Sequence, residues 1–392
     1  MKKLLRVPRP LAPMEATLVR DLPKGAGWQF EPKWDGFRCV AFRDGDSIEL
    51  QSKAGQALGR YFPEIVEAIA SVGAERFVID GEIVIPNEGA FSFDALLQRI
   101  HPAASRVAKL STETPGVLMV FDLIADDDGE SLIDVPLRER RSRLDAFAKR
   151  FFPRGGRVIL SPATGDRDRA VQWESELRGQ GIDGLVAKRI DATYAAGERT
   201  AMQKVKWLRT ADCVVGGFRY GQNSREVGSL LLGLYDDDGV LHHVGFTANI
   251  PRGERASLTR KLESLVGGRG FTGRAPGGPS RWSRGRDTSW NPLNPSLVVE
   301  VQFDAFSEGR FRHGTSLVRF RPDKKPAQCT FEQVDRPKAQ PSASSLASQA
   351  ARAVKRAGRA VTTIHAEEAT RSSPAGTRKR RAAKKRSSNR SS

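Results

Sequence analysis

The stretch FEPKWDGFRC, residues 30–39, places Lys33, Asp35 and Arg38 among aromatic side chains. Lysines usually lie at the surface, where water solvates the ammonium group. A lysine beside Trp34, at the apparent end of a strand, is therefore either a surface residue whose stem packs on the rings or an amine with a chemical role. The other polar motifs of the chain decide between these two interpretations.

The length and charge of the chain limit the kinds of protein it can be. A chain of 392 residues is too long for one compact core and predicts two or three domains. The net charge of +18 indicates a polyanionic partner, most simply nucleic acid. No apolar run long enough to cross a bilayer occurs, so we expect no membrane contact.

The three cysteines, Cys39, Cys213 and Cys329, are far apart and form no CxxC motif. Their spacing argues against a zinc site and fits a reducing compartment. With the basic charge, it predicts a cytoplasmic protein located at the nucleoid.

The basic charge is concentrated at the C-terminal end. Residues 341–392 contain thirteen Lys and Arg, two Glu and no Phe, Trp or Tyr. Such a segment cannot bury a core, so we predict a disordered basic tail over residues 336–392. It is either a solubilising appendage or a segment attracted to phosphate in a salt-dependent way.

The rest of the chain divides by its pattern. Residues 1–209 mix strands and helices, which predicts an α+β domain. Its strands are expected at 28–52, 76–86 (with a kink at Asp80–Gly81), 116–125, 184–190 and 202–209, and its helices at 62–73, 137–151 and 168–181. Residues 210–335 hold about five strands and one helix at 255–266, which suits a small Greek-key barrel of the OB type.

Several short polar clusters stand at predicted strand ends. Each is weak evidence alone, since single exposed charges and turns are common. Together, two carboxylates and several cations could converge on one cleft, as a nucleoside triphosphate and its metal require. In chain order the clusters are KWDGFR (33–38), SKAG (52–55), DGE (80–82), FDL (121–123), DGLVAK (183–188), KVK (204–206) and RPDK (321–324).

This series resembles the motifs of covalent nucleotidyltransferases, in particular those of small two-domain bacterial ATP-dependent DNA ligases. The resemblance runs from about Pro13 to Pro326. It implies an ATP-grasp-like nucleotidyltransferase domain with antiparallel sheets, followed by an OB-fold barrel and the basic tail. It also implies ATP and Mg²⁺ or Mn²⁺ as cofactors.

The resemblance also implies a role for each matching residue. Lys33 would attack the α-phosphate of ATP and become bonded to AMP. Adenine would be read by Glu31 and stacked by Phe121, and the ribose would meet Arg38 and Glu82. Glu82 and Asp183, the latter where the family usually has Glu, would lie at the metal. Phosphates would meet a set of cations that comprises Lys53, Lys188, Lys204, Lys206 and, from the barrel, Arg321 and Lys324.

A lysine titrates near pH 10 in water, so Lys33 must lose a proton before it attacks. We expect burial among aromatic rings and the nearby cations Arg38, Lys204 and Lys206 to lower its pKa.

The implied reaction seals a 5′-phosphate to a 3′-hydroxyl in nicked duplex DNA through a lysyl-AMP and a DNA-adenylate, in DNA repair. The protein would act as a monomer, with repair proteins as possible partners. Two alternatives stay open: an RNA ligase or capping-type nucleotidyltransferase, and a non-catalytic DNA-binding protein with a relic transferase domain.

Overall fold

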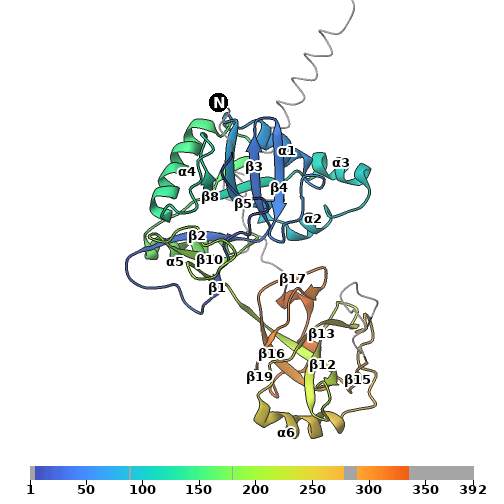
Figure 1. Cartoon of the computed structure of the whole chain (residues 1–392). Coiled ribbons are helices and arrows are strands. Elements are labelled where there is room, and N and C mark those ends of the chain that lie inside the picture. Colours follow the sequence, from blue (N-terminus) through green and yellow to red (C-terminus); the bar gives the residue numbers. More distant parts are fainter. Residues whose placement is uncertain (1–4, 88–89, 179, 278–288, 335–392) are drawn as a thin grey trace, which may run out of the picture.

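The computed structural model describes residues 5–87, 90–178, 180–277 and 289–334. The predicted tail over 336–392 lies outside these residues. Figure 1 shows two bodies in the described part, one above the other, which are connected through strand β12 (Arg209–Tyr220). None of the helices in the described part is long and apolar enough to span a membrane.

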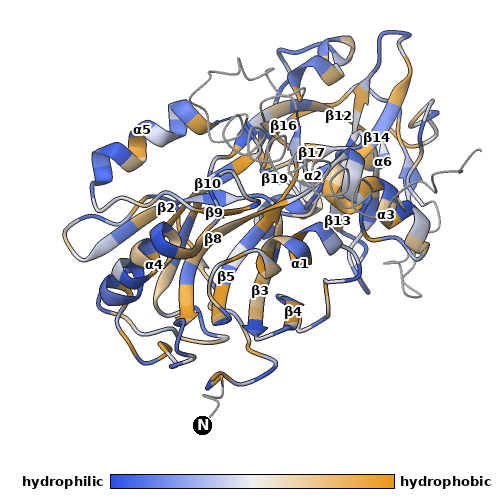
Figure 2. Cartoon of the chain, turned by 90° about the horizontal axis from the view of Figure 1, so that it is seen from above, coloured by the Kyte–Doolittle hydropathy of each residue, from blue (hydrophilic) through white to orange (hydrophobic). Residues whose placement is uncertain are grey.

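The upper body contains a five-stranded sheet in the order β4-β3-β5-β8-β9, antiparallel except for the last pair. The two helices α1 (Pro63–Ala70) and α4 (Leu137–Phe151) share one hydrophobic core with this sheet. Figure 2 shows hydrophobic colouring along its central strands. The strands are β3 (Phe37–Asp44), β4 (Ser47–Ser52), β5 (Arg76–Val84), β8 (Val117–Ala125) and β9 (Val158–Leu160).

A second sheet of this body has the order β1-β11-β10-β2 and packs on the other face of the first. Helix α5 (Arg167–Leu177) covers its outer side, and Asp166 caps this helix by accepting hydrogen bonds from two backbone amides. Its strands are β1 (Thr17–Leu18), β2 (Trp28–Trp34), β10 (Ile182–Arg189) and β11 (Met202–Lys206). Smaller elements are β6 (Pro86–Asn87), β7 (Ala90–Phe91), α2 (Phe93–Leu97) and α3 (Ala104–Glu113).

The lower body is a strongly bent sheet in the order β14-β13-β12-β16-β19, with β15 also paired to β12. A parallel bridge between Thr247 and Thr315 joins its two edges and closes it into a barrel, which is the predicted OB-type fold. Its elements are β13 (Val227–Tyr235), β14 (Leu241–Thr247), α6 (Arg252–Glu263), β15 (Asn291–Pro292), β16 (Val298–Phe303), β17 (Phe306–Ser307), β18 (Arg310–Phe311), β19 (Ser316–Phe320) and the 3₁₀ turns Pro326–Gln328 and Phe331–Gln333.

The structure confirms most of the expected elements. Helix α4 occupies the predicted residues 137–151, and β8 is the predicted buried strand. The register of β5 against β8 shifts at Asp80–Gly81, where a kink was expected. The sheets of the upper body are mainly antiparallel, as predicted.

Candidate active site

Lys33 lies near the end of β2, where this strand pairs with β10. Its Nζ is 3.1 Å from Oδ2 of Asp183, and its side chain is 19% exposed. Gly184 lets β10 pass close to β11, because a Cβ there would lie 1.9 Å from the carbonyl oxygen of Val205. The Asp-Gly pair of β10 therefore brings the predicted lysine and a predicted carboxylate together.

The pKa of Lys33 is raised. Burial lowers it, but attraction by the carboxylates of Asp183 and Asp35 outweighs burial, so the net pKa lies above that of a free lysine. The expected lowering is wrong for this arrangement, because the charges nearest to the amine are carboxylates rather than the anticipated cations. Deprotonation of Lys33 therefore needs something that weakens this attraction.

A cavity of about 250 Å³ lies beside Lys33. One wall is formed by residues 13–16, which precede β1, and the others by strands of both sheets. The structure brings most of the sequence-predicted binding residues into this lining, namely Glu31, Lys33, Arg38, Lys53, Glu82, Phe121, Lys188 and Lys204. Asp183 joins them through its ion pair with Lys33.

Glu31 is a buried carboxylate in the wall of the cavity. Gln29 donates a hydrogen bond of 2.7 Å to Oε1, and the ammonium of Lys188 is 2.9 Å from Oε2. Lys188 also lies 4.6 Å from the ring centroid of Phe121, a cation–π distance. Lys188 is thus held at the Glu31–Phe121 wall, whereas the sequence placed it among the phosphate-binding cations.

Arg38 is fixed by a partner that the sequence interpretation missed. Its guanidinium donates two hydrogen bonds, of 2.5 and 2.6 Å, to the fully buried carboxylate of Asp80, which also accepts one from the Tyr194 hydroxyl. The Arg38 carbon Cζ lies 4.6 Å from the centre of the Phe121 ring. Asp80 therefore orients the arginine against the aromatic wall.

Glu82 follows Asp80 on β5 and lines the cavity. Burial raises its pKa to about 7, although Arg38 and Lys33 act in the opposite direction. Within the described ranges, no three His, Cys, Asp or Glu side chains are placed to hold a metal ion by themselves. A hard divalent cation here would need phosphate or water oxygens in addition to Glu82.

The two lysines of the KVK motif have different surroundings. Lys204 lines the cavity, and its pKa is lowered by burial and then by the charge of Lys33 and other cations. Lys206 is outside the cavity lining, and its Nζ is 2.5 Å from Oδ2 of Asp304 in the barrel. Only Lys204 therefore faces the same space as Lys33.

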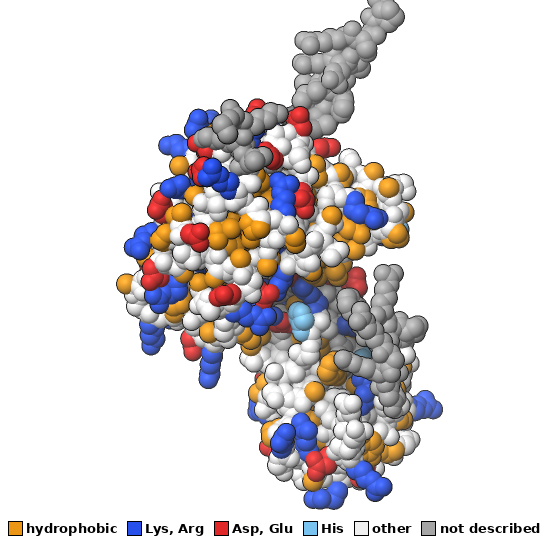
Figure 3. All heavy atoms as spheres, in the orientation of Figure 1, with side chains coloured by type: hydrophobic (Ala, Val, Ile, Leu, Met, Phe, Trp, Pro, Cys, Tyr) orange, Lys and Arg blue, Asp and Glu red, His pale blue; other side chains and the backbone are white. Residues whose placement is uncertain are grey.

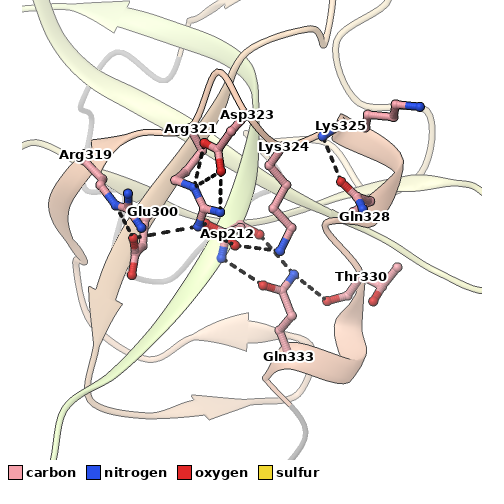
Figure 4. A network of polar contacts seen from close by, with 10 residues as sticks. All are labelled: Asp212, Glu300, Arg319, Arg321, Asp323, Lys324, Lys325, Gln328, Thr330 and Gln333. Atoms are coloured by element: carbon pink, nitrogen blue, oxygen red, sulfur yellow. Dashed lines mark hydrogen bonds and ion pairs between the residues drawn. The ribbon is translucent and has the colours of Figure 1, made fainter.

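Arg321 and Lys324 lie away from the cavity. Both contact the carboxylate of Asp212 on β12, at 2.9 and 2.6 Å, as Figure 4 shows. Arg321 also pairs with Asp323. These two predicted phosphate-binding cations are thus held by carboxylates of the barrel itself.

The two bodies meet close to Lys33. Arg312 of the barrel extends to Asp35, with Nη1 2.6 Å from Oδ2, and its guanidinium lies 3.6 Å from the centre of the Phe93 ring. Asp304 pairs with Lys206 across the same junction and also contacts His313. In Figure 3, basic side chains and a histidine gather where the bodies meet.

Some of these partners left a signal in the sequence. An acidic residue inside an otherwise apolar strand, such as Asp212 in ADCVV, predicts a buried cation beside it. Arg312 and Asp304 have no such context, because they act across a junction between domains. Their positions could not be found from local patterns.

Comparison with known families agrees with this arrangement. Residues 13–206 match the family described as "ATP dependent DNA ligase domain", and residues 223–324 match "ATP dependent DNA ligase C terminal region". A solved structure named "Pmar-Lig_Pre." is 17% identical over 76% of this chain and 64% of its own, with a TM-score of 0.53. That structure shares the fold.

Two curated relatives match this chain over nearly their whole length. DNA ligase C1 of Mycolicibacterium smegmatis is 42% identical over 344 residues, which is 85% of this chain and 96% of the relative. DNA ligase C of Mycobacterium tuberculosis is 43% identical over 349 residues, again 85% and 96%. On this similarity and on both family matches, the chain belongs to the ATP-dependent DNA ligase family.

Proposed function

We propose that this protein is an ATP-dependent DNA ligase that seals 5′-phosphate/3′-hydroxyl nicks in duplex DNA. The observation that carries the proposal is the Lys33 amine, partly buried beside a cavity that is lined by both carboxylates and cations. The family membership supports the same reaction class.

In the first step, the neutral amine of Lys33 attacks the α-phosphorus of ATP. An N–P bond forms, the bond between the α-phosphorus and the bridging oxygen breaks, and pyrophosphate leaves. Before the attack, the Lys33 ammonium gives one proton to the nearest acceptor, the carboxylate of Asp183, which is 3.1 Å away. The second proton that the nitrogen loses as the N–P bond forms goes to water. Lys204 would then offset the charge that develops on the α-phosphate.

The adenine base would lie against Phe121, and its exocyclic amine would donate a hydrogen bond to the Glu31 carboxylate. Because the carboxylate only accepts hydrogen bonds, it would favour the 6-amino group of adenine over the 6-oxo group of guanine. The buried contacts of Gln29 and Lys188 would keep this carboxylate in place. Arg38, oriented by Asp80, would contact the ribose.

A divalent cation, Mg²⁺ or Mn²⁺, fits at Glu82 because this half-buried carboxylate lines the cavity beside Lys33, where phosphate and water oxygens could complete the coordination. When bound, the cation would supply charge neutralisation at the phosphates. Asp183 would assist once it has passed the Lys33 proton on to water and is a carboxylate again. Its side chain is one methylene shorter than Glu, which limits its reach.

After adenylylation, AMP would pass to the 5′-phosphate of the nick, and the 3′-hydroxyl would displace it. The net charge of +18 suits a protein that clamps duplex DNA. Arg321 and Lys324 would meet pyrophosphate in a second arrangement of the domains. We further propose a monomer that works at the nucleoid in repair, with repair proteins as partners.

The test is incubation of the purified protein with α-labelled ATP and Mg²⁺, with GTP in parallel. We expect a covalent protein–AMP adduct that survives denaturation and alkali, is released by acid as a phosphoramidate is, and is abolished by Lys33→Ala; we also expect sealing of a 5′-phosphorylated nick. An adduct with GTP only would favour a capping-type enzyme. Absence of any adduct, with DNA binding retained, would leave a non-catalytic DNA-binding protein.

A further inference from the structure

Tyr194 is a buried tyrosine in the loop between β10 and β11, and the motif series assigns it no role. Its hydroxyl donates a hydrogen bond of 2.5 Å to Oδ2 of Asp80 and accepts one of 3.3 Å from the backbone amide of Met14. A tyrosine hydroxyl can donate and accept at the same time. This hydroxyl therefore joins strand β5 to the segment that precedes β1.

Met14 is held through both of its backbone polar groups. Its amide donates to Tyr194, and its carbonyl oxygen accepts a hydrogen bond of 3.4 Å from Nη2 of Arg38. The same nitrogen of Arg38 donates to Oδ2 of Asp80, which is the oxygen that Tyr194 also contacts. The four residues thus form a closed ring of hydrogen bonds. Residues 13–16 and Arg38 both line the cavity, so this ring joins two of its walls.

The rest of the domain fixes the position of Tyr194. Its amide donates to the carbonyl oxygen of Ile133, and the Arg140 guanidinium lies 5.6 Å from the centre of its ring. The ring belongs to the same hydrophobic cluster as Met14. Burial and the charge of Asp80 raise the pKa of the phenol, so the hydroxyl keeps its proton at neutral pH and remains a donor. The hydroxyl is therefore held in place before any nucleotide binds.

We propose that Tyr194 is a positioning residue for the nucleotide sugar, acting through Asp80 on the Arg38 guanidinium. Through Met14 it also holds the adjoining cavity wall in register with that arginine. Without the hydroxyl, the buried amide of Met14 loses its acceptor, and Oδ2 of Asp80 loses one of the donors that fix it. The effect should reach the sugar alone, since none of these contacts involves the base-binding or phosphate-binding residues of the proposed function.

This inference deepens the proposed function and rests on the ribose contact of Arg38 given there. The test compares equilibrium binding of ATP with that of 2′,3′-dideoxy-ATP, which keeps the base and the triphosphate but has no ribose hydroxyls. Pyrophosphate and Mg²⁺ first reverse any adduct on the purified protein, and a chelator then prevents a new one. The unaltered protein should bind ATP more tightly. If it does so but forms no adduct with Mg²⁺, the ligase reaction is contradicted and this inference is not.

The central variant is Tyr194→Phe, which keeps the ring and removes the hydroxyl. We expect about three- to tenfold weaker binding of ATP and less than about twofold weaker binding of dideoxy-ATP, because only the sugar contact depends on Arg38. Asp80→Asn leaves Tyr194 intact and weakens the hold on Arg38, so it should give the same selective loss; it decides the question if Tyr194→Phe does not fold. In an Arg38→Gln background, Tyr194→Phe should cause less than about a twofold further loss.

The matched control is Tyr220→Phe, which removes a hydroxyl that donates a hydrogen bond of 2.9 Å to Glu263 of the barrel. This variant should bind both nucleotides as the unaltered protein does. The proposal is overturned if the unaltered protein binds both nucleotides equally, or if Tyr194→Phe keeps the full preference for ATP. Equal weakening of both nucleotides by Tyr194→Phe, or an undiminished loss in the Arg38→Gln background, would also overturn it and would identify Tyr194 as a packing residue.

Discussion

Asp183 lies 3.1 Å from the amine of Lys33 and holds it as an ammonium ion. The same contact that positions the amine therefore suppresses its nucleophilicity. Attraction by Asp183 and Asp35 exceeds the effect of burial, so the pKa of Lys33 is raised. Binding of substrate and cation must weaken this attraction, so that the ammonium can give a proton to the Asp183 carboxylate before the amine reacts.

The first prediction concerns the pH dependence of adenylylation. The value of kcat/KM for ATP reports ionisations of the free enzyme. Because only the neutral amine reacts and the pKa is raised, kcat/KM should rise by close to tenfold per pH unit between about pH 6 and 9. Rapid-quench measurement of lysyl-AMP formation checks this. A profile that is level above pH 7 would contradict it.

The second prediction concerns Glu82, whose pKa is raised by burial to about 7. A carboxyl whose folded pKa exceeds its unfolded value binds more protons when folded. Its charge therefore lowers the free energy of unfolding. This destabilisation is absent below about pH 4.5, grows between pH 4.5 and 7, and is complete above about pH 7. Glu82→Gln should raise the melting temperature at pH 8 but not at pH 4.5. The free energy of unfolding at pH 8 should increase by up to about 3 kcal/mol.

The same variant should lose most adenylylation activity at every pH, since the amide removes a charged oxygen ligand from the proposed cation site. Thermal unfolding at the two pH values, in a chelator, separates the stability effect from cation binding. Equal melting temperatures of variant and unaltered protein at pH 8 would show that Glu82 is better solvated than its burial indicates.

Much of the fold could be predicted because local patterns determine it. Helix α4 coincides with residues 137–151 because its apolar spacing starts after Pro136 and ends with basic residues in the last turn. The lysine motif was recognisable because residues 33–38 combine a lysine, a carboxylate and an arginine around a glycine. The motif series then placed eight cavity residues in one site.

The features that the sequence did not predict are contacts between segments far apart in the chain. Lys33 was expected among cations, but the fold places Asp183 and Asp35 closer, which reverses the direction of its pKa shift. Lys206 was expected beside Lys204, and residues two apart do share one side of a strand, but Lys206 is the last residue of β11 and there meets Asp304 of the barrel. Spacing gives the side of a strand but not what lies opposite.

The third prediction concerns the contact of Arg312 with Asp35, in which the side chains are 16% and 6% exposed. Arg312→Ala leaves a buried carboxylate unpaired, which costs about 3 kcal/mol at such sites. Because the partners belong to different domains, we expect the cost to appear as separation of the domains. Small-angle scattering should show a larger radius of gyration, and nick sealing should fall.

The matched control is Arg319→Ala, which removes an arginine of the same barrel that is 61% exposed and pairs with Glu300. Exposed pairs contribute less than about 1 kcal/mol, so this variant should keep the radius of gyration and sealing. If the two variants behave alike, the Arg312 contact does not hold the domains together.

The fourth prediction concerns Gly184, where a Cβ would lie 1.9 Å from the carbonyl oxygen of Val205. Gly184→Ala must push β10 away from β11 by more than about 1 Å, since ordinary contacts are near 3.5 Å. Asp183 precedes this glycine, so its carboxylate moves relative to Lys33. A displacement of this size can cost about a hundredfold in rate, which single-turnover adenylylation would detect.

Gly165→Ala is the control for this substitution, because a Cβ there has no atom within 4 Å. It should leave the adenylylation rate and melting temperature unchanged. A Gly184→Ala protein that adenylylates as fast as this control would mean that β10 can shift without moving Asp183. The close approach of β10 to β11 would then serve packing alone, and the position of Asp183 would depend on its contact with Lys33.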